Sequence, residues 1–213
     1  LPSLSGDALE ARLATYQRLT SAFEHADGYA YKSELTGVLK GLGFTEEESD
    51  FMKINTLYEL LRHGVEKFAS RTAFDMFNGE SVTYAEVGRR AAAVQEALVG
   101  AGVKAGDKVA LLSSSMPNWG ICYLAVTSAG MVAVPILPDF SGPELDMIIA
   151  HSEAKALLVS DKLFSKLSKQ TIDSLNIVIR TKNLGIIAQH VTATGSTAVP
   201  SPDDLAAIIY TSG

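Results

Sequence analysis

Cysteine is nearly absent from this chain of 213 residues, in which Cys122 stands alone. A single cysteine excludes a disulfide within the chain, and the first residues lack the basic segment and apolar run of a secretory signal. Both observations favour a reducing, cytoplasmic compartment. Cys122 lies in an apolar run, which favours a small buried side chain over a nucleophile. No stretch approaches the roughly 20 apolar residues that span a bilayer, so we expect no transmembrane segment.

Positive charge is also scarce. The chain holds 18 lysines and arginines against 24 aspartates and glutamates, for a net charge of −6. Residues 1–50 contain nine acidic and four basic residues, whereas the remainder is close to neutral. An acidic surface disfavours contact with a phosphate backbone, so no nucleic-acid partner is expected. The change in charge near residue 50 indicates that two segments of different origin meet there.

Residues 1–51 are expected to form an α-helical hairpin. Apolar residues recur every three or four positions in two stretches, which is the spacing of one helical face. They are Leu9, Leu13, Tyr16, Leu19 and Phe23 in the first stretch and Tyr31, Leu35, Val38, Leu39 and Leu42 in the second. Two helices of this size bury little apolar surface by themselves. We therefore expect them to need a partner, which is either the rest of this chain or another copy of it.

Residues 52–213 change to an alternation of helical and strand patterns. This order predicts an α/β fold with a mostly parallel sheet flanked by helices. The expected helices cover residues 57–68, 87–101, 119–128, 143–152 and 161–169. The expected strands cover residues 72–77, 81–83, 108–113, 131–137, 156–160, 176–180 and 205–210. The first two strands flank Asn78 and Gly79, a strong hairpin signal, and residues 192–203 have the composition of a loop.

Gly100, Gly102 and Gly106 invite comparison with a dinucleotide-binding fingerprint. That fingerprint is spaced G-x-G-x-x-G, and it follows a strand and opens a helix, so that the helix N-terminus meets a pyrophosphate. Here the spacing is G-x-G-x-x-x-G, and the expected helix precedes the glycines while a strand follows them. We therefore interpret these glycines as a helix stop and a turn.

The histidines give no sign of a metal or catalytic site. They lie far apart in the sequence without a second ligand at metal spacing, and no set of serine, histidine and acid stands out. The four are His25, His63, His151 and His190. We assign no catalytic residue and no metal ligand.

The last residues combine an apolar strand pattern with small hydroxyl residues and glycine. Residues 208–210 lead directly into Thr211, Ser212 and Gly213. Phosphate-binding turns are built this way, because glycine lets backbone N–H groups approach the phosphate and hydroxyls donate to its oxygens. Thr211, Ser212 and Gly213 are therefore the candidate cofactor-binding residues. Taken alone, the same pattern also fits an ordinary strand-to-turn junction.

The order of segments from Thr56 to Gly213 resembles the adenylate-forming superfamily of acyl-CoA synthetases, luciferases and nonribosomal-peptide adenylation domains. The resemblance is carried by residues 56–61, 70–74, 82–87, 106–110, 115–119, 128–136, 152–156 and 203–213. Residues 115–119 are similar to the family's Asn-x-x-Glu-Trp turn but lack its glutamate. Within the superfamily, the pattern is most similar to bacterial long-chain fatty acid-CoA ligases.

The resemblance implies a reaction in which a carboxylate and ATP form an acyl-adenylate and pyrophosphate, before the acyl group passes to a thiol. It implies ATP, Mg²⁺ and CoA as cofactors and a fatty acid as substrate. On this interpretation residues 52–213 are the N-terminal part of a ligase, cut off inside its phosphate loop. We then expect the chain alone to bind none of these cofactors and to be inactive. Its expected partners are the missing remainder of the ligase and, through exposed apolar surface, a second copy.

Residues 28–34 and 38–48 resemble the helical segment of ABC-F type ATPases, although that family's phosphate loop and signature motif are absent. The likeness implies that residues 1–51 are a fusion segment, and an ordinary helical hairpin is the alternative. Two other functions stay open for the whole chain. One is an ABC-F derived binding module, and the other is a structural chimera without catalytic function.

Overall fold

The computed structural model describes residues 54–76 and 79–210. The chain divides into two units, Leu1–Lys53 and Ile54–Gly213, and every described residue belongs to the second unit. The expected helical hairpin, with its resemblance to ABC-F ATPases, therefore lies outside the described residues, and the expected domain boundary stays a prediction.

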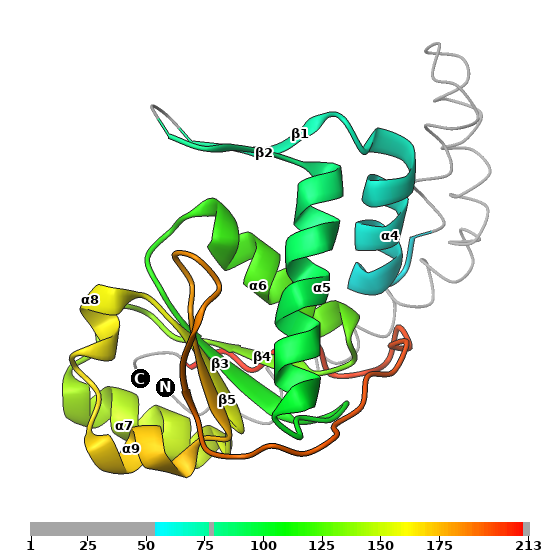
Figure 1. The fold of residues 1–213 in the computed structure, drawn as a ribbon. Coiled ribbons are helices and arrows are strands. Elements are labelled where there is room, and N and C mark those ends of the chain that lie inside the picture. The colour runs from blue at the N-terminus through cyan, green and yellow to red at the C-terminus, as the bar shows by residue number, and fades with distance from the viewer. Residues whose placement is uncertain (1–53, 77–78, 211–213) are drawn as a thin grey trace, which may run out of the picture. The chain divides into compact units, whose positions relative to one another are not determined.

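A five-stranded sheet forms the centre of the second unit (Figure 1). Its strands are β3 (Lys108–Leu112), β4 (Val132–Pro135), β5 (Ala156–Val159), β6 (Ile177–Arg180) and β7 (Ile186–Gln189). The spatial order is β4-β3-β5-β6-β7, in which the first four strands run parallel and β7 pairs antiparallel with β6. The expected α/β fold with a mostly parallel sheet flanked by helices is confirmed.

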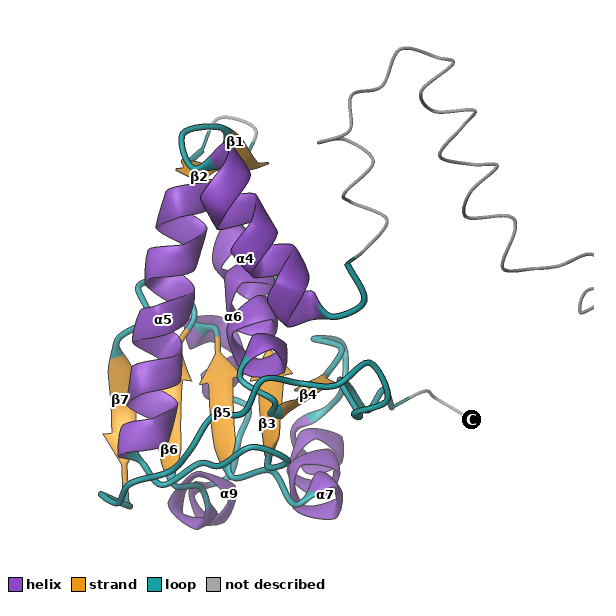
Figure 2. Ribbon diagram, turned by 90° about the vertical axis from the view of Figure 1, so that its right-hand side faces the viewer, coloured by secondary structure: helices purple, strands orange, loops and turns teal. Residues whose placement is uncertain are grey.

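Helices cover both faces of this sheet, and Figure 2 shows the layers. On one side are α5 (Tyr84–Gly100) and α6 (Pro117–Ser128), with α4 (Leu57–Phe68) packed against both. On the other are α7 (Gly142–Ser152), α8 (Asp161–Phe164) and α9 (Lys169–Ser174). A small antiparallel hairpin of β1 (Thr72–Asp75) and β2 (Ser81–Thr83) leads into α5. Within residues 54–76 and 79–210, no helix has both the length and the apolar character that crossing a membrane requires.

The strands bury side chains on both of their faces, as strands of a parallel sheet do when helices cover both sides. Along β3, Val109 and Leu111 join the core beneath α5 and α6, whereas Ala110 and Leu112 join the core beneath α7. These four side chains are at most 1% exposed. Removing the side chain of such a leucine typically costs about 2–5 kcal/mol of folding free energy, so the core leaves little tolerance for substitution.

Cys122 lies in the core on α6 and is fully buried. Burial raises the pKa of the Cys122 thiol to about 12. A thiol with this pKa is protonated at neutral pH, and solvent does not reach it. The expectation that Cys122 is a small buried side chain rather than a nucleophile is confirmed.

The glycines after α5 adopt the turn that their spacing predicts. α5 ends at Gly100, and Gly102 and Gly106 have φ angles of 78° and 84°, in the left-handed region that favours glycine. β3 begins two residues after Gly106. Because a helix precedes these glycines and a strand follows them, the interpretation as a helix stop and a turn is confirmed.

The single helix expected over residues 161–169 is wrong, since α8 ends at Phe164 and the next helix, α9, begins only at Lys169. Ser168 starts the second helix, because its Oγ accepts a hydrogen bond from the backbone N–H of Thr171 at 3.2 Å. Leu163 and Leu167 are both buried. Packing of these two leucines against the sheet therefore replaces the continuous helix.

The strand expected over residues 205–210 is also wrong. Ala133 of β4 donates to Ala206 O and accepts from Ile208 N–H, both at 2.9 Å, and this isolated parallel bridge is the whole pairing. The next outward-facing residue of β4 is Pro135, which has no N–H to donate, so the ladder cannot continue. At the opposite edge of the sheet lies the four-residue strand β7, which is not among the strands expected from the sequence.

Residues 191–208 form an irregular segment, here named the strap, that includes the loop expected over residues 192–203. The strap runs past the amino end of β3 and is held there by backbone hydrogen bonds. Gly195 N–H donates to Val99 O at 2.7 Å, and Ser196 exchanges hydrogen bonds with Val103 and Ala105. A Cβ atom added at Gly195 would lie 1.8 Å from Val103 O, so only glycine allows this approach.

We expect Gly195→Ala to lower the free energy of unfolding by about 1–3 kcal/mol, because the strap must move away from Val103. Urea denaturation of the whole chain measures the change. The matched control is Gly100→Ala, where an added Cβ meets no atom within 4 Å and the stability should stay within about 1 kcal/mol. A denaturation midpoint for Gly195→Ala equal to that of the parent would contradict the close approach.

Candidate functional site

The carboxyl ends of the parallel strands border a cavity of about 610 Å³. The cavity is lined by residues at or just beyond the ends of β3 and β4, by the first turns of α6 and by the two residues after the strap. These residues are Ser113, Ser115, Trp119, Tyr123, Pro135, Ile136, Leu137, Pro138, Ile209 and Tyr210. Open parallel α/β sheets bind their ligands beyond the carboxyl ends of the strands. The volume lies within the range of roughly 300–1,000 Å³ that is usual for small-molecule sites.

One wall of this carboxyl-edge cavity is a pair of stacked aromatic rings. Trp119 and Tyr123 are four residues apart on α6, with ring centroids 5.6 Å apart and an angle of 6° between the planes. The lining also includes Leu137 and Ile209, which are 59% and 72% exposed. Large apolar side chains left exposed around a hollow are typical of a surface that receives an apolar ligand or another polypeptide segment.

Tyr210 lines the cavity and is held by a contact with His151. Its Oη lies 2.7 Å from Nδ1 of His151 on α7, and the two rings meet edge to face. The candidate cofactor-binding residues Thr211, Ser212 and Gly213 follow Tyr210 directly in the chain and lie outside the described residues. Their role in binding a cofactor therefore stays a prediction. The described residue that precedes them, Tyr210, contacts His151 and lines the cavity.

Polar side chains connect the segment that follows β3 and the start of α6 with the residues that follow β6. Ser113 Oγ lies 2.9 Å from Thr181 Oγ1. The side-chain amide of Asn118 donates to the backbone oxygens of Thr181 and Lys182 at 2.7 and 3.1 Å. Both Asn118 and Thr181 are buried. The open cavity lies on the β4 side of these bonds, and Ser113 belongs to its lining.

Arg90 of α5 holds Asn118 in place and is itself held by two carboxylates. Its guanidinium donates to Asn118 Oδ1 at 2.9 Å, to Glu86 at 2.6 Å and to both oxygens of Glu80. The hydrogen bond to Glu80 is the largest cause that raises the pKa of Arg90. Hydrogen bonds from Arg89 and then Arg90 lower the pKa of Glu86 to about 2. The network ties the β1–β2 hairpin and α5 to the start of α6, and thus to the wall that carries Trp119.

The structure assigns local roles to the histidines that it describes. His151 pairs with Tyr210, and His190 lies 2.9 Å from the backbone oxygen of Leu175. In the part of the chain that is described, no group of three histidine, cysteine, aspartate or glutamate side chains could hold a metal ion. His25 lies outside the described residues.

The residues that build the cavity wall were not among the candidates drawn from the sequence. Trp119 and Tyr123 carry a signal that could have found them, because two aromatic residues four apart face the same side of a helix that starts beyond a strand. No sequence pattern indicates that Pro135, Leu137 and Tyr210 line the cavity. Their place there depends on β4 and the end of the strap lying side by side.

A parallel α/β sheet with an open cavity at its carboxyl edge defines a domain of the ligand-binding α/β class. Residues 61–213 match the family described as AMP-binding enzyme. Since the match covers well over half of the chain, the chain belongs to the AMP-binding enzyme family. The superfamily resemblance stated from the sequence is confirmed at this level, whereas the fatty acid-CoA ligase subtype and the ABC-F likeness find no support in the matches.

Relatives include tyrocidine synthase 3 of Brevibacillus parabrevis, 29% identical over 80% of this chain and 3% of that protein. The 4-coumarate–CoA ligase-like 9 of Oryza sativa subsp. japonica is 28% identical over 74% of this chain and 30% of its own length. Among solved structures, the Klebsiella oxytoca NpsA N-terminal subdomain in complex with 3-hydroxyanthranilyl-AMSN has a TM-score of 0.59. It is 24% identical, over 74% of this chain and 38% of that one, and shows the shared fold. The chain thus spans less than two fifths of each of these relatives.

We expect Glu86→Gln to flatten the acid side of the stability profile. The pKa of Glu86 is about 2 in the folded chain, below its usual 4.5, so its contribution is present above about pH 4.5 and disappears as the pH falls toward 2. Urea unfolding at several pH values in this window should show a smaller loss of stability for the variant than for the parent. Glu96→Gln, on the exposed side of the same helix, is the control and should keep the parental profile. Equal slopes for all three proteins would contradict the role of Glu86.

Proposed function

We propose that this chain contributes to an ATP-dependent enzyme that activates a carboxylic acid as its acyl-adenylate. One observation carries the proposal: the AMP-binding family match runs to residue 213, through the hydroxyl and glycine residues that follow Tyr210 in the sequence. In this proposal Thr211, Ser212 and Gly213 begin the cradle for the phosphates of ATP. Backbone N–H groups and hydroxyls suit that task, because the reaction requires the departing pyrophosphate to be held in line and its charge to be stabilised.

The carboxyl-edge cavity supports an apolar acid as the substrate. Its walls are mainly apolar, and its polar side-chain groups are hydroxyls and one indole N–H rather than charged groups. They belong to Ser113, Ser115, Tyr123, Tyr210 and Trp119. A fatty acid is the substrate that the sequence resemblance implies. The names of the relatives widen the choice to amino acids and aryl acids, because they include a tyrocidine synthase and a 4-coumarate–CoA ligase-like protein. Mg²⁺ with ATP, and CoA or another thiol as acyl acceptor, belong to the same proposal.

The test is carboxylate-dependent exchange of labelled pyrophosphate into ATP. It should be run with the 213-residue chain and with the whole product of the gene that encodes it. A panel of fatty, aryl and amino acids then identifies the substrate class. The proposal predicts exchange by the gene product with at least one of these acids. A gene product that binds ATP but exchanges pyrophosphate with none of them would overturn it.

Ser212→Ala and Thr211→Ala in the exchanging protein should each lower the exchange rate by roughly 10²–10³-fold, the usual effect of removing one preorganised donor from a reacting group. The matched control is Thr194→Ala, an exposed threonine of the strap, for which the rate should not change. If both variants exchanged at the parental rate, these hydroxyls would have no role in holding the phosphates.

A further inference from the structure

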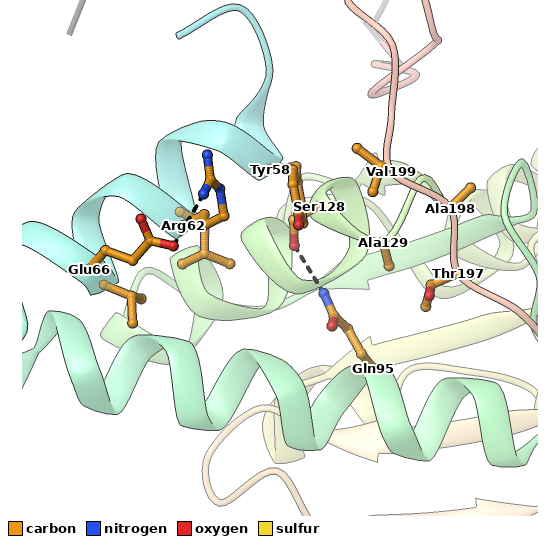
Figure 3. A pocket seen from close by; sticks show the side chains of 11 residues that line it. Tyr58, Arg62, Glu66, Gln95, Ser128, Ala129, Thr197, Ala198 and Val199 are labelled. Carbon is orange, nitrogen blue, oxygen red and sulfur yellow. Dashed lines mark hydrogen bonds and ion pairs between the residues drawn. The ribbon is translucent and has the colours of Figure 1, made fainter. Parts of the chain in front are cut away.

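A second cavity lies at the far end of α6 from the carboxyl-edge cavity, and Figure 3 shows its lining. It has a volume of about 480 Å³ and lies between α4, α5, the last residue of α6 and residues 197–199 of the strap. Helix α6 has twelve residues and is therefore about 18 Å long. The two cavities have no lining residue in common. This second cavity, here named the strap cavity, is thus a separate site.

The floor of the strap cavity carries a fixed pair of polar side chains. Gln95 Nε2 donates to the backbone oxygen of Ala125 and to Ser128 Oγ, both at 2.9 Å (Figure 3). These two bonds use both hydrogens of the amide and leave Gln95 Oε1 as an acceptor. Ser128 Oγ accepts from Gln95, so its own hydroxyl hydrogen remains available as a donor.

Neither of these remaining groups has a hydrogen-bond partner among the described residues. Ser128 is only 4% exposed, and both side chains line the cavity. A buried hydroxyl hydrogen without an acceptor is unfavourable unless water or a ligand accepts it. The cavity lining therefore carries an unused acceptor, Gln95 Oε1, and an unused donor, the hydroxyl of Ser128. The two side chains are hydrogen-bonded to each other.

The walls and the rim limit the ligand further. Leu61, Val65 and Val199 supply apolar surface. At the rim, Arg62 and Glu66 form an ion pair at 3.2 Å, with both side chains 56% exposed, so their charges largely cancel. A ligand with a net charge has no unmatched counter-charge to meet here.

We propose that the strap cavity is a second binding site, for a small neutral molecule that carries a carboxamide on an apolar group. The N–H of a carboxamide can donate to Gln95 Oε1 while its carbonyl accepts from Ser128 O–H. A carboxylate lacks the donor and an ammonium lacks the acceptor, so each would leave one floor group unpaired. The apolar group of the ligand then contacts Leu61, Val65 and Val199.

The experiment titrates the whole 213-residue chain with isobutyramide and, as matched probes of the same shape, with isobutyrate and isobutylamine. Nuclear magnetic resonance follows the side-chain NH₂ signals of Gln95. Isobutyramide should shift them in a saturable way, with a dissociation constant on the order of 1–10 mM as expected for so small a ligand. The two charged probes should bind at least roughly tenfold more weakly.

Two variants locate the binding. Ser128→Ala should weaken isobutyramide binding by roughly tenfold. A second variant, Val199→Trp, is included because Ser128 is buried. Val199 is 69% exposed, and a larger side chain there covers the opening without entering the core. Ile209→Trp, at a 72% exposed position of the other cavity, is its control and should leave binding unchanged.

Saturable binding of isobutyramide that Val199→Trp weakens and Ile209→Trp does not would support the site. Equal binding of all three probes, or binding that neither Ser128→Ala nor Val199→Trp changes, would overturn it. The absence of saturable binding to the folded parent chain would overturn it as well. None of these outcomes depends on ATP or on carboxylate activation, so the proposed function is tested separately.

Discussion

Strand β3 is paired on both of its edges and buried on both of its faces, and the remaining elements take their positions from it. β4 and β5 pair with it in parallel register, so that Val109 lies beside Ala133 and Ala156. Its alternating side chains enter the two separate cores, one beneath α5 and α6 and one beneath α7. Because each of these side chains is almost fully buried, a shift of one residue would exchange the two cores. The register of β3 thereby also fixes where Ser113 leaves the sheet.

Backbone hydrogen bonds hold the strap in place, and Ala207 and Ile208 add side-chain packing against the two cores. Gly195 approaches Val103 so closely that no side chain fits between them, and the bridge at Ala133 ends where Pro135 has no donor to offer. The strap carries the chain past the amino end of β3 and on to Tyr210 at the carboxyl edge. Each cavity therefore has one wall from the strap or its continuation, and neither exists until the strap has docked.

At the carboxyl edge, a network of hydrogen-bonded polar side chains connects α5, the start of α6 and the residues after β6. Asn118 joins Arg90 of α5 to the backbone of Thr181, and the carboxylates that neutralise Arg90 come from its own helix and from the hairpin. The side chain of Arg90 is partly buried, at 17% exposed, and a guanidinium in such a position is stabilised when its donors are matched in this way. The carboxyl-edge cavity lies on the β4 side of this network, and the stacked rings of Trp119 and Tyr123 form one of its walls.

The sequence by itself determined the α/β class, most of the helices and strands, the glycine turn after α5 and the family. All of these depend on local periodicity, capping residues and ordered motifs. The tertiary structure alone decided that residues 205–210 form one bridge rather than a strand, because Pro135 belongs to a different segment. It also decided that the helix beginning at Asp161 ends at Phe164, with a second helix from Lys169, and that β7 joins the sheet. The cavity walls formed by Tyr210, by Trp119 with Tyr123 and by Gln95 with Ser128 could not be predicted either. Their members are far apart in the chain, and only the packing of the strap and α6 on the sheet brings them together.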